Sequence, residues 1–317
     1  MDTRIVGVDL GGTRMRVAVL DTSCHLLRRY EEPTRAHEGP DAVIPRLLDL
    51  IGKVIADGDE PPIRAIGISS PGPIDPMSGA ILSPPNLPGW VNVPLGRLIQ
   101  ERFHLPTYIG NDANVAALAE VYQGAARGHK NAIYITVSTG IGGGVVIGGR
   151  LFEGARGLAG EIGHMVILVE GEQVSTLERE AAGPAIARRA VARIRAGEPS
   201  RIVEMVQGDL DAVTGKTVGR AAEEGDRLAL EVVNRAARIV GYGVVSLMHL
   251  FNPSIFVIGG GVSNLGDLLF GPVREVVRTH ALDRAYWEHT PIVPAALGED
   301  VAIIGAATLA MSQMGLL

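Results

Sequence analysis

The sequence predicts an α/β protein in which helices pack on β-sheets. Short runs rich in β-branched residues recur along the chain, each bounded by Gly, Pro or Asn, as strands commonly are. These runs lie at residues 4–10, 16–21, 65–70, 132–138, 144–149 and 255–260. Segments with apolar residues at helical spacing alternate with them, at residues 42–57, 114–126 and 227–250. Such alternation is typical of layered α/β folds. We expect irregular connections at 171–176 and 196–216.

Length and composition narrow the range of functions. The 317 residues suggest two domains of ordinary size. The formal net charge of −6 leaves no basic surface for a phosphate backbone, so nucleic acid is not an expected partner. The single cysteine, Cys24, allows neither an intrachain disulfide nor a Cys-based zinc site, and it favours a reducing compartment, the cytoplasm by default. The chain has no uninterrupted apolar run of about 18 residues, so neither a membrane span nor a secretion signal is expected.

Two segments, residues 6–21 and 134–152, repeat one pattern: a strand, a small polar residue, a Gly-rich turn and a second strand. Each is expected to form a hairpin whose tip is nearly bare backbone. Two similar lobes are therefore expected. Backbone N–H groups at such a tip can converge on phosphate oxygens, because no Cβ stands in the way. For DLGGT at 9–13 taken alone, a plain hairpin turn is the alternative.

Two standard phosphate-binding motifs do not match. VTGKT at 213–217 resembles the end of a P-loop, but that motif needs glycine at the position of Leu210. A dinucleotide-binding G-x-G-x-x-G that starts at Gly140 would need glycine at the position of Val145. A third glycine cluster, IGGGVS at 258–263, follows a predicted strand. Three Gly-rich loops at strand ends suit ATP held between two lobes.

A series of motifs, in order from residue 4 to about 310, resembles the ROK family of sugar kinases and repressors. The motifs are DLGGT at 9–13, SPGPID at 70–75, PNLPGW at 85–90, NDANVAALAE at 111–120, STGIGGG at 138–144, EGARGLAGEIGH at 153–164 and NPSIFVIGGGVS at 252–263. The resemblance implies the two-lobed actin-like ATPase fold of the hexokinase type, with a ribonuclease H-like core in each lobe. It implies a small lobe of residues 1–112, rejoined by a C-terminal helix at about 300–317, and a larger lobe of residues 113–299.

The resemblance also implies residue roles. Asp112 matches the family's catalytic base, which in phosphoryl transfer mainly orients the attacking hydroxyl. From the residues alone, Asn111 and Asp112 are a helix N-cap pair. Likewise, Glu161 and His164 are three residues apart, and a lone Glu-x-x-His is more often a surface pair or a core histidine than a ligand site. The residues that match the family's sugar ligands are Asn86, Asn111, Asp112, Glu161, His164 and Glu178. The residues implied to bind ATP are Asp9, Gly11, Gly12, Thr13, Thr139 and Gly140 around the phosphates, and Gly260 and Gly261 at the adenosine. Asp9 is implied to meet Mg²⁺ through water.

The chain departs from the family after His164. Most members have a C-x-C-G-x-x-G-C zinc loop that leads into a Leu-Glu pair, whereas residues 165–177 read MVILVEGEQVSTL and contain no cysteine. We therefore expect no zinc, and we expect the apolar run MVILV to pack where the metal would otherwise tie the segment down. What holds the segment that carries Glu178 is then a question for the structure.

The leading hypothesis is an ATP- and Mg²⁺-dependent hexose kinase, most simply a glucokinase that phosphorylates the C6 hydroxyl. Kinases of N-acetylmannosamine, N-acetylglucosamine or fructose are alternatives. Repressors of the family carry an N-terminal helix-turn-helix, and since the first strand is predicted at residue 4, a DNA-binding regulator is not expected. Asp9, Asp112 and the glycine loops argue against a sugar sensor without activity. The resemblance also implies a homodimer or homotetramer.

Overall fold

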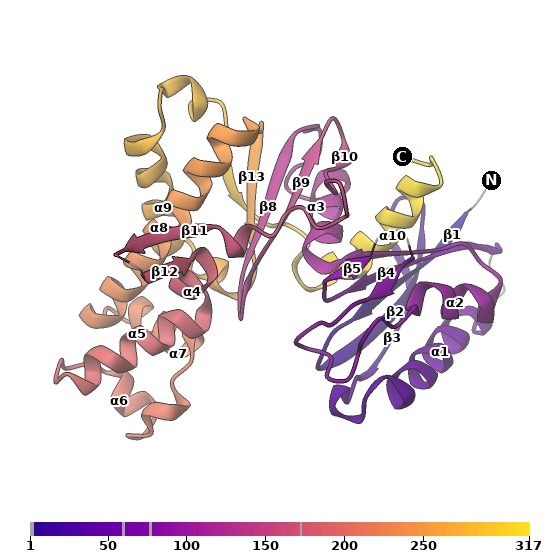
Figure 1. Cartoon of the computed structure of the whole chain (residues 1–317), viewed down its shortest axis with the longest axis horizontal. Coiled ribbons are helices and arrows are strands. Elements are labelled where there is room, and N and C mark those ends of the chain that lie inside the picture. The colour runs from indigo at the N-terminus through magenta and orange to yellow at the C-terminus, as the bar shows by residue number, and fades with distance from the viewer. Residues whose placement is uncertain (1–2, 59–60, 76–77, 172) are drawn as a thin grey trace. The chain divides into compact units, whose positions relative to one another are not determined.

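The computed structural model describes residues 3–58, 61–75, 78–171 and 173–317, which fold into two compact units (Figure 1). The first unit comprises Met1–Gly128, Gly144–Ala159 and Ala296–Leu317, and the second comprises His129–Gly143 and Gly160–Ala295. The first unit continues past residue 112, where the sequence places a lobe boundary, because helix α3 (Asp112–Tyr122) packs against helix α10 (Val301–Gln313).

A five-stranded sheet forms the centre of the first unit. Strand β2 pairs antiparallel with both β3 and β1, whereas β1, β4 and β7 run parallel to one another. In spatial order the strands are β3 (Leu26–Pro33), β2 (Arg14–Asp21), β1 (Arg4–Leu10), β4 (Ile63–Ser70) and β7 (Thr107–Asn111). Strands β5 (Ile74–Asp75) and β6 (Ala80–Ile81) form a separate antiparallel pair.

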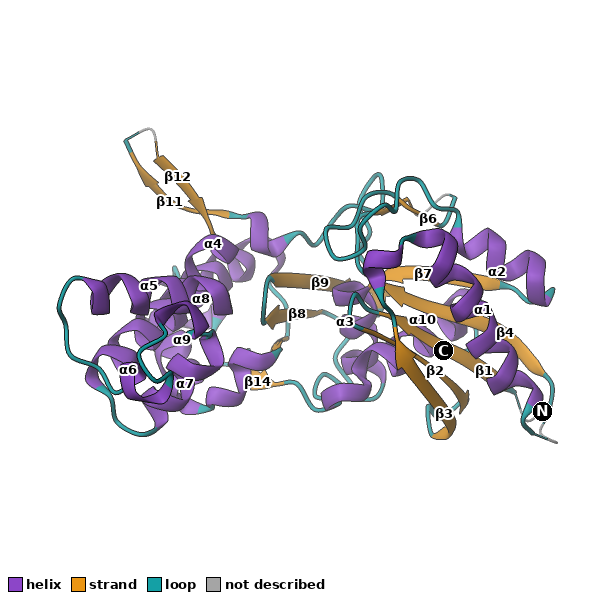
Figure 2. Ribbon diagram, turned by 90° about the horizontal axis from the view of Figure 1, so that it is seen from below, coloured by secondary structure: helices purple, strands orange, loops and turns teal. Residues whose placement is uncertain are grey.

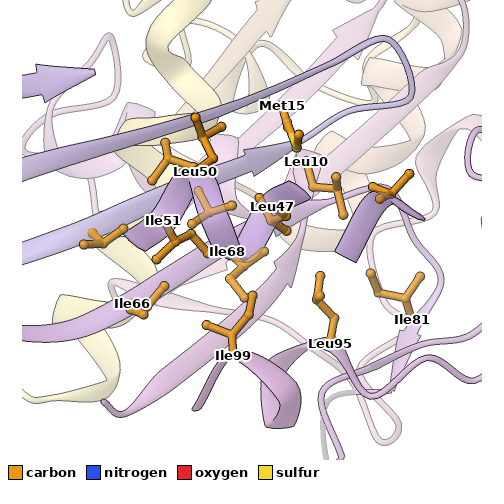
Figure 3. Close-up of a cluster of buried hydrophobic side chains, with 14 of the residues drawn as sticks. Leu10, Met15, Leu47, Leu50, Ile51, Ile66, Ile68, Ile81, Leu95 and Ile99 are labelled. Atoms are coloured by element: carbon orange, nitrogen blue, oxygen red, sulfur yellow. The ribbon is translucent and has the colours of Figure 1, made fainter. Parts of the chain in front are cut away.

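Helices α1 (Pro40–Ala56) and α2 (Leu95–Phe103) cover one face of this sheet. Their apolar side chains and those of the strands form one buried cluster, in which Leu47 and Ile51 of α1 lie near Ile66 and Ile68 of β4 (Figure 3). Burial of these aliphatic side chains is the main favourable contribution to the stability of the unit.

Helix α10 lies against the opposite face of the sheet. Ile303, Ala307 and Met311 of α10 belong to a second buried cluster with strands β1 and β2. The helix approaches so closely that a Cβ on Gly67 of β4 would lie 1.8 Å from the carbonyl oxygen of Ala306. Glycine is therefore required at residue 67, and the C-terminal helix is an integral part of the first unit.

The second five-stranded sheet repeats the strand order of the first. Its β8, β13 and β14 are parallel neighbours, and β8 and β9 correspond to the β1–β2 hairpin. In spatial order the strands are β10 (Arg150–Leu151), β9 (Ile141–Ile147), β8 (Ala132–Val137), β13 (Ile255–Gly259) and β14 (Ile292–Pro294). This repeat confirms the α/β class and the two Gly-rich hairpins predicted from the sequence.

The helices of the second unit gather around α8, the longest of them. Asp226 caps the N-terminus of α8 by accepting a hydrogen bond from the N–H of Ala229 (2.8 Å). The helices are α4 (Leu177–Ala181), α5 (Gly183–Arg195), α6 (Ile202–Met205), α7 (Gly215–Glu223), α8 (Arg227–Phe251) and α9 (Asp267–His280). None of the helices in the described ranges is long and apolar enough to cross a membrane.

The expectation of an irregular connection is wrong for 171–176, because residues 173–176 form a strand, whereas 196–216 is mostly irregular, as expected. Strand β12 (Gln173–Thr176) pairs with β11 (Val166–Glu170) in an antiparallel hairpin that projects from the helices of the second unit (Figure 2). Residue 172, within the first of these segments, lies outside the described residues. The second segment contains α6 and the start of α7. Helix α6 has only four residues, too few to show a periodic apolar pattern.

Candidate functional site

In the first unit, the tip of the β1–β2 hairpin carries the predicted phosphate-binding residues. The N–H of Gly11 donates to the carbonyl oxygen of Arg14 (3.1 Å), and the hydroxyl of Thr34 donates to that of Gly11 (2.6 Å). A Cβ on Gly12 would lie 2.6 Å from the carbonyl oxygen of Asn86. The structure thus places a predicted phosphate-binding glycine against the backbone of a predicted sugar ligand.

Asp9 is the penultimate residue of β1, beside this tip, and it pairs with Arg16. Nε and Nη2 of Arg16 lie 2.8 and 2.6 Å from Oδ2 of Asp9. Burial raises the pKa of the Asp9 carboxyl, and the charge and hydrogen bond of Arg16 act in the opposite direction. Sequence reasoning did not identify Arg16, although the antiparallel register of a two-strand hairpin places it directly opposite Asp9.

The predicted base and its neighbour begin helix α3. Asn111 is the N-cap, and its Oδ1 accepts a hydrogen bond from the N–H of Ala113 (3.0 Å). Oδ1 of Asp112 accepts from the same N–H (2.8 Å), and the side chain of Asp112 is exposed. A Cβ on Gly72 would lie 2.5 Å from Nδ2 of Asn111, so the SPGPID loop lies against this cap. The capping role of Asn111 predicted from the sequence is confirmed, and Asp112 still presents its carboxylate to solvent.

In the second unit, the other three predicted sugar ligands gather around Ile141, the first residue of β9. Oε2 of Glu178 accepts a hydrogen bond from the N–H of Ile141 (2.8 Å). Glu161 precedes a 3₁₀ turn (Ile162–His164), and His164 is its last residue. Within this turn, a Cβ on Gly163 would lie 2.0 Å from the carbonyl oxygen of Ile141. The side chains of Glu161 and His164 are exposed. The alternative of a buried core histidine therefore does not apply to His164.

The β11–β12 hairpin occupies the segment in which most family members have a zinc loop. Next to it, the N–H of Leu177 donates to the carbonyl oxygen of Met165 (2.9 Å), which joins the two ends of the hairpin. Glu180 on α4 accepts hydrogen bonds from Ser175 of β12 (2.8 Å) and Arg235 of α8 (2.7 Å). Burial opposes ionisation of Glu180, but these two partners lower its pKa overall. Backbone pairing and one ion-pair network therefore hold the short helix that carries Glu178.

The apolar run that begins at Met165 does not pack as expected. Val166, Leu168 and Val169 are 55%, 43% and 65% exposed. The prediction that this run becomes buried in place of the zinc loop is therefore wrong for these side chains, because strand pairing, rather than burial, gives the segment its structure.

A cavity of about 980 Å³ lies beside the predicted adenosine-binding glycines of the second unit. Thr139 and Gly261 both line it, and helices α5 and α7 provide much of its wall. Gly260 has a left-handed φ of 86°, and a Cβ there would lie 2.5 Å from the carbonyl oxygen of Val137. Residue 260 must be glycine for the loop after β13 to lie this close to β8. The volume is typical of a site for a nucleotide-sized molecule.

Sequence reasoning missed the contribution of residues 214–216 to this cavity. Thr214, Gly215 and Lys216 line it at the N-terminus of α7, where Thr214 and Thr217 form a capping box. A Cβ on Gly215 would lie 2.8 Å from the Cα of Gly183, so α5 and α7 nearly touch. Residues 213–217 therefore do not match a P-loop, yet Lys216 lines a cavity large enough for a nucleotide.

The predicted site residues are divided between the two units. Asp9, Gly11, Gly12, Thr13, Asn86, Asn111 and Asp112 belong to the first unit, and Thr139, Gly140, Glu161, His164, Glu178, Gly260 and Gly261 belong to the second. Within the part of the chain that the structure describes, no group of three or more His, Cys, Asp or Glu residues could hold a metal ion by itself.

Comparisons with known proteins show what this chain is similar to. A family model described as ROK family matches residues 5–313. The glucokinase of Thermotoga maritima is 35% identical over 316 residues, which cover 98% of each protein. A solved ROK family glucokinase from Streptomyces griseus, in complex with glucose and AMPPNP, is 32% identical with a TM-score of 0.81, over 96% of this chain and 98% of that one. A xylose repressor of Caldicellulosiruptor bescii is 30% identical over 98% of this chain and 78% of the repressor.

Proposed function

Since the chain belongs to the ROK family, with its family model matching residues 5–313, we propose that it is an ATP-dependent glucokinase that phosphorylates the C6 hydroxyl of glucose. The observation that carries this proposal is the clustering of candidate sugar ligands next to candidate phosphate loops in each unit. Asn86 lies at the β1–β2 tip, and Glu178 lies at the β8–β9 tip. The full-length similarity to glucokinases supports the choice of glucose.

The sugar is bound by side chains that can each engage neighbouring hydroxyls. Asn86, Asn111 and Asp112 supply amide and carboxylate groups in the first unit, and Glu161, His164 and Glu178 supply carboxylates and an imidazole in the second. Carboxylates accept hydrogen bonds from sugar hydroxyls, whereas amides both donate and accept. A site of this kind rejects a sugar that lacks one hydroxyl, because a buried polar group is then left without a partner.

Asp112 is the catalytic residue of this proposal. Its carboxylate is exposed at the first turn of α3, and the bond from the N–H of Ala113 fixes its position. It accepts a hydrogen bond from the C6 hydroxyl, orients that oxygen for attack and takes its proton late in the transfer. Bound ATP supplies the phosphoryl group.

The residues present fit a nucleotide with its cation. The cavity beside Thr139 and Gly261 suits the adenosine, and the glycine tips leave room for phosphates that a Cβ would fill. Asp9 offers one carboxylate to Mg²⁺. Because Mg²⁺ gives up its bound waters reluctantly, it would keep several of them and take further ligands from the phosphates.

The proposal includes alternative substrates, an oligomeric state and a location in the cell. N-acetylmannosamine, N-acetylglucosamine and fructose are the next substrates to test. A homodimer or homotetramer and a cytoplasmic location follow from family resemblance and from the single cysteine. The absence of structural zinc follows from the cysteine-free sequence of residues 165–177.

An ADP-release assay over a panel of hexoses tests the proposed function. We expect release of ADP with glucose that depends on both ATP and Mg²⁺. Binding of a sugar without any ADP release would instead favour a sugar sensor, and ADP release with only an amino sugar would reassign the substrate.

A further inference from the structure

Arg16 is a buried charged residue that the proposed reaction does not yet use. It lies on β2 opposite Asp9 on β1, and the side chains of the two residues are 9% and 14% exposed. Nε and Nη2 contact Oδ2 of Asp9 at 2.8 and 2.6 Å. Nη1 donates to the backbone carbonyl oxygen of Glu299 at 2.8 Å. All three guanidinium nitrogens therefore have an acceptor.

The form of the pairing between Arg16 and Asp9 is informative. An arginine that pairs with a carboxylate in the fork-to-fork manner occupies both of its oxygens. Here both contacts are to Oδ2, so Arg16 fixes the orientation of the carboxylate through one oxygen. No hydrogen bond to the other oxygen, Oδ1, is formed by the side chains of the described residues, so Oδ1 can accept from a further donor.

The second contact of Arg16 anchors it to a fixed segment. Glu299 lies in a 3₁₀ turn (Gly298–Asp300) that leads into α10. Immediately before this turn, the N–H groups of Ala296 and Leu297 donate to the buried carboxylate of Glu120 on α3. The guanidinium is thus held between the β1–β2 hairpin and the start of α10, and its position does not depend on Asp9 alone.

We propose that Arg16 is a positioning residue for the nucleotide-bound Mg²⁺: it holds Asp9 by Oδ2 so that Oδ1 accepts a hydrogen bond from a water of the hydrated cation. This inference rests on the proposed function, in which Mg²⁺ binds together with ATP. Partners in the outer shell orient the groups that face a metal, and removing such a partner typically weakens metal binding about 10- to 100-fold.

The pair is not explained by stability alone. A buried ion pair gains little over well-packed apolar residues of similar volume, because both charges must be taken out of water. Removal of only one partner is costly, since the other charge is then left uncompensated. The test therefore needs one variant that keeps the positive charge and one that does not.

Calorimetric titration with a non-hydrolysable ATP analogue, with and without Mg²⁺, tests the proposal without measuring turnover. For the wild-type protein we expect Mg²⁺ to tighten binding of the analogue. For Arg16→Met we expect this gain to fall about 10- to 100-fold. For Arg16→Lys we expect an intermediate loss, because an ammonium is a point charge that cannot engage Asp9 and the carbonyl of residue 299 in the same geometry.

Glu299→Gln is the matched control. It keeps the backbone carbonyl that Arg16 uses and removes only the exposed ion pair with Arg14 (3.2 Å). We expect its gain with Mg²⁺ to equal that of the wild type. Thermal unfolding of every variant shows whether it is folded, and if Arg16→Met does not fold, Arg16→Lys decides.

Two results would overturn the role of Arg16. One is a full Mg²⁺ gain in the folded Arg16 variants, and the other is a wild-type protein whose binding of the analogue does not respond to Mg²⁺. Phosphorylation of glucose by the wild type alongside either result would leave the proposed function intact. A wild type that phosphorylates no hexose would refute the proposed function itself.

Discussion

The carboxylate of Glu120 accepts a hydrogen bond from the N–H of Ala296 at 3.0 Å, at the residue where the chain re-enters the first unit. The same carboxylate accepts from Leu297 (3.1 Å) and from Ala125 (2.7 Å), which shortly precedes the exit at Gly128. Glu120 is 1% exposed. One buried side chain at the end of α3 therefore fixes both the segment that leaves the unit and the segment that returns to it.

We expect Glu120→Ala to lower the free energy of unfolding by about 3 kcal/mol or more, because three backbone N–H groups lose their acceptor. Glu120→Gln keeps one acceptor oxygen and should lose less. Denaturant unfolding of the purified variants measures both effects. Glu101→Ala is the control, since Glu101 lies on an exposed helix face and its change should stay within about 0.5 kcal/mol. An equally small effect of Glu120→Ala would show that the hydrogen bonds of the Glu120 carboxylate contribute little to stability.

We expect Asp112→Asn to reduce kcat by at least about 100-fold while glucose still binds. Asparagine keeps the acceptor oxygen that contacts the N–H of Ala113, so the start of α3 should remain intact. It loses the charge that orients and finally deprotonates the hydroxyl. Steady-state kinetics and calorimetric titration with glucose separate the two effects. Turnover close to that of the wild type would restrict Asp112 to its place in the helix.

We expect the thiol of Cys24 to react slowly in the folded protein. Burial raises its pKa, although Thr308, whose hydroxyl oxygen lies 3.7 Å from Sγ, acts in the opposite direction. A raised pKa means less thiolate at a given pH. Because the folded protein favours the neutral thiol, its stability falls as the pH rises above the pKa that the Cys24 thiol has in the unfolded chain. A colorimetric thiol assay at pH 8 should show slow labelling, and full labelling in denaturant.

Ser23→Cys is the matched control for this assay, because residue 23 is exposed on the same turn. The variant should show one fast thiol in addition to the slow one. Fast labelling of the wild type would mean that Cys24 is not protected.

We expect the protein, purified without a histidine tag, to contain no stoichiometric zinc. Structural zinc normally has four ligands, most often Cys and His, whereas residues 165–177 contain neither. A chelator should therefore leave the thermal unfolding midpoint unchanged. Elemental analysis gives the direct answer, and roughly one zinc per chain would contradict the expectation and imply ligands of another kind.

The sequence predicts the regular parts of this protein well, because local patterns carry that information. Runs such as 132–138 and 255–260 are β-branched and bounded by turn residues, and the structure has strands there. Strand β12 was missed because it exists only through its pairing with β11. No pattern within residues 171–176 by itself shows that pairing.

The residues of the candidate site also fall into those that local motifs predict and those that depend on contacts between distant segments. The glycine tips and Asn111 were recognisable from short motifs. The place of Lys216 beside the cavity depends on how α5 and α7 approach each other through Gly183 and Gly215, which are 32 positions apart in the numbering and adjacent only in the fold. The roles of Arg16 and Glu120 likewise depend on Glu299 and Ala296, which return from the far end of the chain.

Identification of the product formed from glucose and ATP shows whether this protein is a glucokinase. We expect the wild-type protein, with Mg²⁺, to convert glucose to glucose 6-phosphate and to release one ADP for each phosphoryl group transferred, and we expect Asp112→Asn not to do so. Nuclear magnetic resonance of the product identifies the phosphorylated carbon. If no phosphorylated sugar forms from glucose or from any other hexose in the panel, the kinase assignment is contradicted.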